Sequence, residues 1–149
     1  MKPQPHIHEI EIHYKRPVFD TQKSVSCHED SYRILRELIN PNTIDYKEEF
    51  WLLLLSNANQ VLHVAKISTG TSRATIVSIS EIMQLALKVH SHALILAHNH
   101  PSGKLKASEA DIAITRKVAD AAELLDLKLL DHLIITSESY LSFVQEGLL

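Results

Sequence analysis

The chain has 149 residues, of which 45% are hydrophobic and 22% are charged, and its formal net charge at pH 7 is −3. This length and composition are typical of one globular domain, which excludes a disordered or fibrous protein. The excess of acidic over basic residues argues against a strongly basic nucleic-acid surface.

The N-terminal segment has no apolar core of the signal-peptide type, and no hydrophobic run reaches the length of a membrane span. We therefore expect a cytoplasmic protein without a membrane partner. One domain is predicted over residues 1–149, in which residues 1–20 form an N-terminal extension. An edge strand is expected over residues 7–15, where hydrophobic and polar residues alternate. Its hydrophobic face would carry Ile10, Ile12 and Tyr14.

Short apolar runs then alternate with amphipathic segments, which predicts an α/β fold with a single mixed β-sheet flanked by helices. A helix is expected from residue 28 until just before Pro41, since the residue before a proline disfavours helical geometry. Its predicted buried side carries Ile34, Leu35, Leu38 and Ile39. Residues 50–56 are apolar on both faces, which indicates a central strand, and a turn leads to a second strand over 61–68.

A further short strand is predicted over residues 75–80. Ser78 and Glu81 have the spacing of a capping box and should open a helix that reaches about Val89. The apolar residues 93–97 should form another strand. A long helix over 108–125, a last strand over 127–137 and a short C-terminal segment complete the predicted order of elements.

The strand at 93–97 is followed at once by two histidines, His98 and His100. Side chains on a strand alternate between faces, so both imidazoles should project from the same side while Asn99 points away. Pro101 cannot continue the ladder, and Gly103 permits a sharp reversal. The two imidazoles are therefore expected together at a strand end, where both can reach one ion.

Asp111 is the predicted third ligand. Ser108 and Asp111 have the spacing of a capping box, so the alternative is that they only begin a helix. Helical periodicity, however, places Asp111 at the head of a stripe with Val118, Ala122 and Leu125, opposite a charged face. That opposite face carries Arg116, Lys117, Asp120 and Glu123. An unpaired carboxylate on a buried stripe is costly, which favours a bound cation beside it.

Two imidazoles and one carboxylate, with a position left for water, are the ligands of a catalytic zinc site. Because Cys27 is the single cysteine, thiolate ligation is excluded. A zinc-activated water also needs a proton acceptor, and the candidates are Glu48 and Glu49 at the start of the predicted central strand. Only one of them can face the site, and the hydrophobic pattern does not choose between them.

These residues resemble the JAMM signature of the MPN-domain metallopeptidases: His98-x-His100, seven intervening residues, Ser108, two more residues and Asp111, with a glutamate far upstream. Within that group, the sequences ILAHNHPSG, LLDHLII and the closing SF resemble the RadC-type proteins. The resemblance covers roughly residues 20 to 149 and implies the MPN/JAMM, deaminase-like architecture.

The resemblance implies that Zn²⁺ is held by His98, His100 and Asp111, with the upstream glutamate as the general acid and base. In RadC-like chains this glutamate stands two residues before a phenylalanine, which selects Glu48, and Glu49 is the fallback. Ser108 would help to hold the tetrahedral oxyanion. Full-length RadC proteins also carry an N-terminal helix-hairpin-helix region that suggests DNA contact, and we do not expect this region in the present sequence.

Other histidines and the cysteine are given structural roles. His6 and His8 are expected on an exposed edge strand, and His90 and His92 at the end of a helix, where imidazole suits the helix dipole. His132 is interpreted as a hydrogen-bonded core histidine. Cys27 is expected to be inert, because no local cluster of positive charge is present to activate its thiol.

The sequence thus predicts a zinc-dependent metallopeptidase or isopeptidase that acts on a protein or peptide substrate, with an activity that a partner could keep latent. The alternative is a DNA-transaction module of repair or mobile-element machinery, either a nuclease or a non-catalytic binder. The lysines near the histidines are expected to flank the site rather than to bind nucleic acid, so DNA binding by this chain should be weak or absent. A homodimer is one option for its assembly.

Overall fold

The computed structural model describes residues 11–18, 23–70 and 76–149. Within these ranges five strands form one sheet in the order β2-β1-β3-β4-β5. The strands are β1 Glu49–Leu55, β2 Val61–Thr69, β3 Ala93–Asn99, β4 Lys128–Ile135 and β5 Tyr140–Ser142. The β3 and β4 strands run parallel and the other neighbours run antiparallel. The predicted α/β fold with a single mixed sheet is confirmed.

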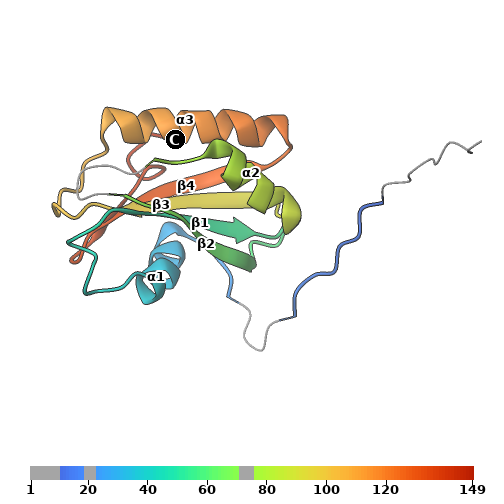
Figure 1. The fold of residues 1–149 in the computed structure, drawn as a ribbon, viewed down its shortest axis with the longest axis horizontal. Helices are drawn as coiled ribbons and strands as arrows, with labels where there is room; N and C mark the ends of the chain where they lie inside the picture. The colour runs from blue at the N-terminus through green and yellow to red at the C-terminus, as the bar shows by residue number, and fades with distance from the viewer. Residues whose placement is uncertain (1–10, 19–22, 71–75) are drawn as a thin grey trace, which may run out of the picture.

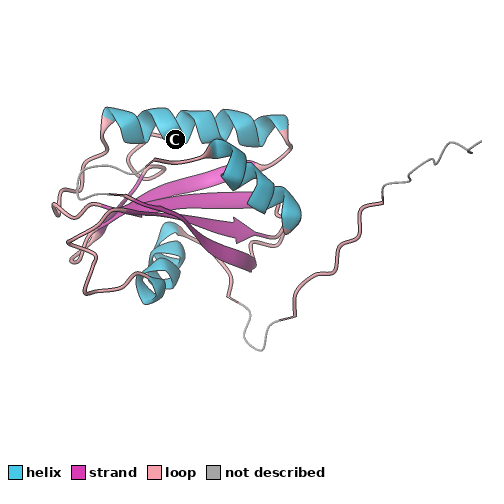
Figure 2. Cartoon of the chain, in the orientation of Figure 1, coloured by secondary structure: helices cyan, strands magenta, loops and turns pink. Residues whose placement is uncertain are grey.

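Three helices cover the two faces of this sheet (Figures 1 and 2). They are α1 His28–Leu38, α2 Ile79–Lys88 and α3 Glu109–Leu124. In Figure 1, α1 lies below the sheet, whereas α2 and α3 lie on the opposite side. The α3 helix is also the connection between the parallel strands β3 and β4, because antiparallel hairpins cannot join parallel neighbours.

The central strands β1 and β3 are buried along their whole length. This follows from their sequences, since a strand covered by helices on both faces needs apolar residues at odd and even positions alike. Phe50 pairs with His98 across these strands, and Trp51 pairs with Ala97. Phe50 belongs to the core beneath α2 and α3, and Trp51 to the core beneath α1. The register therefore assigns His98 to the α2/α3 face.

The helix ends agree with the caps expected from the sequence. The Ser78 side chain accepts a hydrogen bond from the Glu81 amide at the start of α2, and α1 ends before Pro41. Two predicted core positions were wrong. Leu38 is 48% exposed because it is the last residue of α1, and Leu125 is 40% exposed because it lies beyond the last turn of α3.

Two predicted strands are also wrong where the structure describes them. Residues 11–15 of the N-terminal strand have no strand partner, and Ile12 is 96% exposed; alternation alone does not form a strand without a neighbour to accept its hydrogen bonds. Residues 7–10 lie outside the described residues, as do His6 and His8. Residues 76–78 of the short strand predicted over 75–80 form no strand, and α2 begins at Ile79. Thr75 lies outside the described residues.

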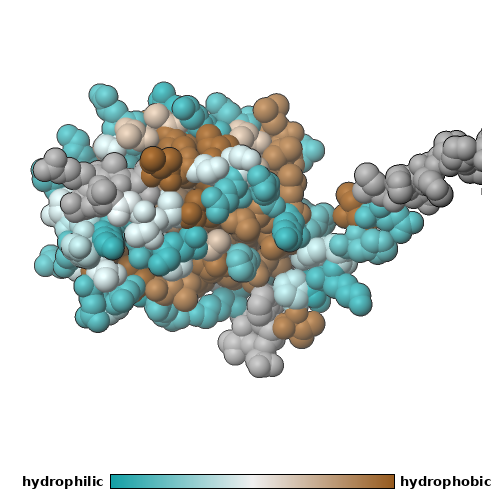
Figure 3. All heavy atoms as spheres, in the orientation of Figure 1, coloured by the Kyte–Doolittle hydropathy of each residue, from teal (hydrophilic) through white to brown (hydrophobic). Residues whose placement is uncertain are grey.

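The surface mixes hydrophilic and hydrophobic residues, and brown hydrophobic surface runs through the middle of the face shown in Figure 3. Exposed hydrophobic side chains beside or on α2 include Ile76 and Leu87. Among the described residues, no helix has the length and apolar character needed to cross a membrane.

Candidate metal centre

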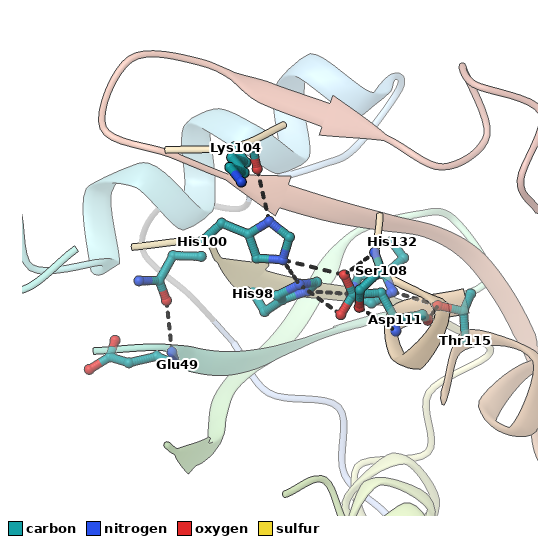
Figure 4. Close-up of polar contacts among 9 residues, drawn as sticks. Glu49, His98, His100, Lys104, Ser108, Asp111, Thr115 and His132 are labelled. Atoms are coloured by element: carbon teal, nitrogen blue, oxygen red, sulfur yellow. Dashed lines mark hydrogen bonds and ion pairs between the residues drawn. The ribbon is translucent and has the colours of Figure 1, made fainter. Parts of the chain in front are cut away.

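Three side chains meet at the end of β3 (Figure 4). The Nε2 atoms of His98 and His100 are 2.9 Å apart. Asp111 reaches both rings, with Oδ1 3.2 Å from His98 Nε2 and Oδ2 3.3 Å from His100 Nε2. One donor atom from each residue lies within 4.8 Å of the others, so the cluster could hold a metal ion. The three residues predicted as ligands are thus brought together.

The loop after β3 orients the second imidazole. The turn that follows Pro101 closes through a hydrogen bond from the Gly103 amide to the His100 carbonyl, and Gly103 has a φ of 77°, a value that favours glycine. The chain then places the Lys104 carbonyl 2.8 Å from His100 Nδ1. Because a carbonyl only accepts, Nδ1 must carry the proton of a neutral ring, and Nε2 is left to face the cluster.

Asp111 caps α3 and also faces the histidines. Its amide donates to Ser108 Oγ at 3.0 Å, and its Oδ2 accepts from the Ser108 amide at 2.8 Å, which completes a capping box. The same carboxylate contacts His98 and His100. The two interpretations of Ser108 and Asp111 are therefore compatible, because a carboxylate has several lone pairs and can serve the cap and the cluster together.

Charge and burial shift the pKa values of this cluster in opposite directions. Burial tends to raise the pKa of Asp111, but its contacts with the His100 and His98 rings outweigh burial and hold the pKa well below the ordinary aspartate value. Burial tends to lower the pKa of His100, but its hydrogen bonds to Asp111 and to the Lys104 carbonyl raise the pKa overall. The contact therefore favours the ionised form of the Asp111 carboxyl and strengthens the hold of the His100 ring on a proton.

The two candidate glutamates face different sides of the sheet. Glu48 lies just before β1 and lines the same cleft as His100 and Asp111. Glu49 is the first residue of β1 and bonds Lys66 Nζ at 3.2 Å; in Figure 4 its carboxylate points away from the cluster. The alternation that begins with Phe50 opposite His98 explains this difference, because Glu48 shares the face of Phe50 and Glu49 does not.

Burial raises the pKa of Glu48, and the nearby Asp111 acts in the same direction, while His98 and His100 oppose both. A carboxylate whose pKa is raised toward neutrality is a better proton carrier than an ordinary glutamate. Ser108 also lines this cleft, which has a volume of about 660 Å³, and its side chain is exposed there.

Sequence reasoning missed the buried hydrogen bonds that begin at His98, on the side of its ring away from Asp111. His132 was correctly interpreted as a hydrogen-bonded core histidine, but its partner is His98 itself, whose Nδ1 lies 2.8 Å from His132 Nε2. Thr115 Oγ1 lies 2.7 Å from His132 Nδ1. No local pattern marks these contacts, which join β3, β4 and α3. Asn99 likewise was expected only to point away from the site.

The remaining candidates lie apart from the cluster. His90 and His92 lie just beyond the end of α2 with their rings 5.2 Å apart, and Cys27 is an exposed free cysteine before α1. Within residues 11–18, 23–70 and 76–149, no second group of three metal-binding side chains lies close enough to hold an ion.

The chemistry of the donor set fits zinc. Two imidazole nitrogens and one carboxylate oxygen are ligands that zinc accepts, and a three-residue set is typical of sites that keep a position for water. Each histidine ring also has a hydrogen bond at its other nitrogen, Nδ1: that of His98 with His132, and that of His100 with the Lys104 carbonyl. Such outer contacts are usual for metal-binding histidines.

A mixed sheet with two histidines at the end of a central strand, and an aspartate in the first turn of the next helix, is the arrangement of a JAB/MPN-type domain. Comparison with family models agrees, because the RadC-like JAB domain matches residues 25–148. The chain belongs to the RadC-like JAB domain family.

The chain is also similar to proteins of the UPF0758 group. It is 44% identical to a UPF0758 protein of Flavobacterium johnsoniae over 126 residues, which are 85% of this chain and 54% of the relative. It is 46% identical to a UPF0758 protein of Neisseria meningitidis serogroup B over 97 residues, 65% of this chain and 43% of the relative. The chain thus spans about half the length of the curated relatives that it matches.

Proposed function

We propose that this domain is a zinc-dependent metallopeptidase or isopeptidase that hydrolyses an amide bond. The observation that carries the proposal is the presence of Glu48 in the same cleft as His100 and Asp111, opposite the face on which Glu49 pairs with Lys66. A metal-holding cluster and a separate, partly buried carboxylate are what metal-assisted hydrolysis requires.

His98, His100 and Asp111 hold the metal in this proposal. A bound zinc ion supplies a Lewis acid that polarises a carbonyl and lowers the pKa of water. Glu48 accepts the proton of the attacking water and delivers it to the leaving amine. Its raised pKa suits both steps, because the group must take the proton and then release it.

Ser108 is the proposed donor to the oxyanion. Its Oγ accepts a hydrogen bond from the Asp111 amide, so the hydroxyl proton is still available to a substrate oxygen. An oriented donor of this kind stabilises the negative charge that develops during amide hydrolysis.

The substrate proposed is a protein or peptide. Lys104 and Lys106 line the cleft beside apolar residues that include Phe50 and Ile114. The two lysines would attract an acidic peptide or a C-terminal carboxylate, and the apolar wall would contact hydrophobic side chains.

The test is cleavage of a peptide library by the zinc-loaded protein, with new amino termini identified by mass spectrometry. Glu48→Gln should lower turnover by about 10²–10⁴-fold, the usual contribution of a general acid or base. Glu49→Gln is the matched control and should change turnover only a few-fold. Absence of cleavage by the zinc-loaded wild type, or equal losses in both variants, would contradict the proposal. Cleavage of DNA instead of peptides would favour the DNA-transaction alternative.

A further inference from the structure

A continuous chain of hydrogen bonds runs behind the metal centre (Figure 4). It begins at His98 Nδ1, which lies 2.8 Å from His132 Nε2. His132 Nδ1 lies 2.7 Å from Thr115 Oγ1. Thr115 Oγ1 donates in turn to the Asp111 carbonyl at 2.5 Å. The chain therefore starts at one cluster residue on β3, crosses β4 and ends on the backbone of another cluster residue on α3.

The last contact fixes the direction of every proton in this chain. A carbonyl oxygen can only accept, so the Thr115 hydroxyl uses its single proton on Asp111. The hydroxyl must then accept from His132, whose Nδ1 carries a hydrogen. A neutral imidazole has one such hydrogen, so His132 Nε2 has a lone pair and accepts from His98 Nδ1. It follows that the lone pair of a neutral His98 is on Nε2.

The argument requires a neutral His132, and its surroundings provide for this. The side chain is fully buried, stacked on Phe143 at 4.6 Å and in edge contact with Phe50 at 5.6 Å between ring centroids. The neighbouring Asp131 carboxylate is occupied by the Ser142 hydroxyl and the Val144 amide. A buried imidazole without a bonded carboxylate remains uncharged.

We propose that His132 and Thr115 are positioning residues that hold His98 in the tautomer protonated at Nδ1, and so present its Nε2 lone pair to His100 and Asp111. This inference rests on the proposed function, because it assigns His98 as a ligand through Nε2. Neither residue contacts substrate or metal in this scheme. Thr115 also ties the start of α3, which carries Asp111, to β4.

The other tautomer would work against metal binding. His98 Nε2 lies 3.2 Å from Asp111 Oδ1, a contact that invites a proton onto Nε2. An ion could bind to Nε2 only after that atom had lost its proton. The chain through His132 and Thr115 opposes this state by requiring a proton on Nδ1. Outer hydrogen bonds of this kind typically change metal affinity by about 10–100-fold.

The first test reads the tautomer directly, in the metal-free protein. Nitrogen-15 NMR of the histidine rings at about pH 9, well above the ordinary imidazole pKa of about 6.5, should show His98 protonated at Nδ1 and not at Nε2. In His132→Phe, which fills similar space but offers no acceptor, the His98 proton should move wholly or partly to Nε2. An Nε2-protonated His98 in the wild type, or a tautomer unchanged in His132→Phe, would overturn the proposal.

The second test measures zinc affinity by competition with a chromophoric chelator. His132→Phe should bind zinc about 10–100-fold more weakly. Thr115→Val should also weaken binding, and Thr115→Ser, which restores the hydroxyl, should recover it. The matched control is Thr136→Val, which removes a buried hydroxyl that bonds only the Ser139 backbone. This control should keep wild-type affinity.

The two proposals fail in different ways. If the wild type bound no zinc, the proposed function would be wrong, yet the tautomer of His98 would still decide the roles of His132 and Thr115. If zinc bound normally and peptides were cleaved, but folded Thr115→Val and His132→Phe matched the wild type in affinity, only the positioning roles would be wrong.

Discussion

Asn99 Oδ1 accepts a hydrogen bond from the Glu49 amide at 2.7 Å, so the residue between the two clustered histidines holds the beginning of β1. Its Nδ2 donates to the carbonyls of Ile44 and Lys47, both at 2.7 Å. The side chain is fully buried. Glu48 lies between two of these anchored residues, so Asn99 fixes the backbone of the proposed proton carrier from the far face of the sheet.

Asn99→Leu should therefore impair both folding and turnover. It removes three hydrogen bonds and leaves buried backbone groups unsatisfied, which should lower the free energy of unfolding by about 3 kcal/mol or more. Turnover should fall by about 10-fold or more, because Glu48 would be displaced, whereas the ligands for zinc remain. Urea unfolding, peptide cleavage and zinc titration measure the three effects.

The matched control for Asn99→Leu is Leu53→Ala, which removes a fully buried side chain of β1 on the α1 face. It should lose about 2–5 kcal/mol of stability while it keeps turnover under conditions where it is folded. Equal turnover of Asn99→Leu and the wild type would show that Asn99 has only a structural role.

How far the sequence predicts this site depends on the distance between the interacting residues. Local patterns identified both histidines, and the family resemblance selected Glu48. The choice between Glu48 and Glu49 depends physically on Phe50 pairing with His98, a cross-strand register that local periodicity does not contain.

The supporting contacts are also long-range. His132 is 34 residues from His98, and Asn99 is 50 residues from Glu49. A polar residue within an apolar strand indicates that hydrogen-bond partners exist, but the sequence does not show which residues they are. The two wrongly predicted strands show the reverse situation, in which a local pattern is present but its long-range partner is missing. Hydrophobic and polar residues alternate near Ile12 and Ile76, but the described residues there have no neighbouring strand to pair with.

Substitutions can separate the roles of Asp111 and Ser108 in helix capping and in metal binding. Asp111 is proposed to have both roles, whereas Ser108 caps the helix but does not bind the metal. Asp111→Asn keeps a side-chain oxygen that can accept from the Ser108 amide, but it removes the negative charge, so zinc affinity should fall by about 100-fold or more. Ser108→Ala should instead cost about 1 kcal/mol as a lost helix cap and leave zinc affinity within a few-fold of wild type. Thermal unfolding and chelator competition distinguish these outcomes. Zinc affinity that survived in Asp111→Asn would reduce Asp111 to a cap.

The raised pKa of Glu48 predicts a pH-dependent cost to stability in the metal-free protein. A folded-state pKa above the unfolded value, about 4.3, means that the folded protein holds this proton more tightly. Stability contributed by Glu48 therefore falls as pH rises through the interval between the two values, and the full penalty applies above it. Glu48→Gln cannot ionise, so it should be more stable than wild type near neutral pH and lose this advantage as the pH falls toward about 4.

Urea unfolding of the metal-free protein at several pH values measures this effect. Glu49→Gln is the control, because Glu49 is paired with Lys66 and its removal should not stabilise the fold. A Glu48→Gln variant less stable than wild type near neutral pH would mean that the Glu48 carboxylate is favourably paired and not held at a cost.

The last prediction is that this chain binds DNA weakly and without sequence preference. Affinity for the phosphate backbone comes mainly from counterion release by clustered lysine and arginine, but 15 basic residues here face 18 acidic ones. Lys104 and Lys106 lie at the cleft, next to the acidic Glu109 and Asp111. Fluorescence anisotropy with duplex and single-stranded DNA at about 0.15 M salt should show no tight binding. The double variant Lys104→Glu, Lys106→Glu should cleave acidic peptides less well, and this loss should be larger than for neutral peptides. If the wild type bound DNA at submicromolar concentration and the double variant did not, the two lysines would instead be assigned to nucleic-acid binding.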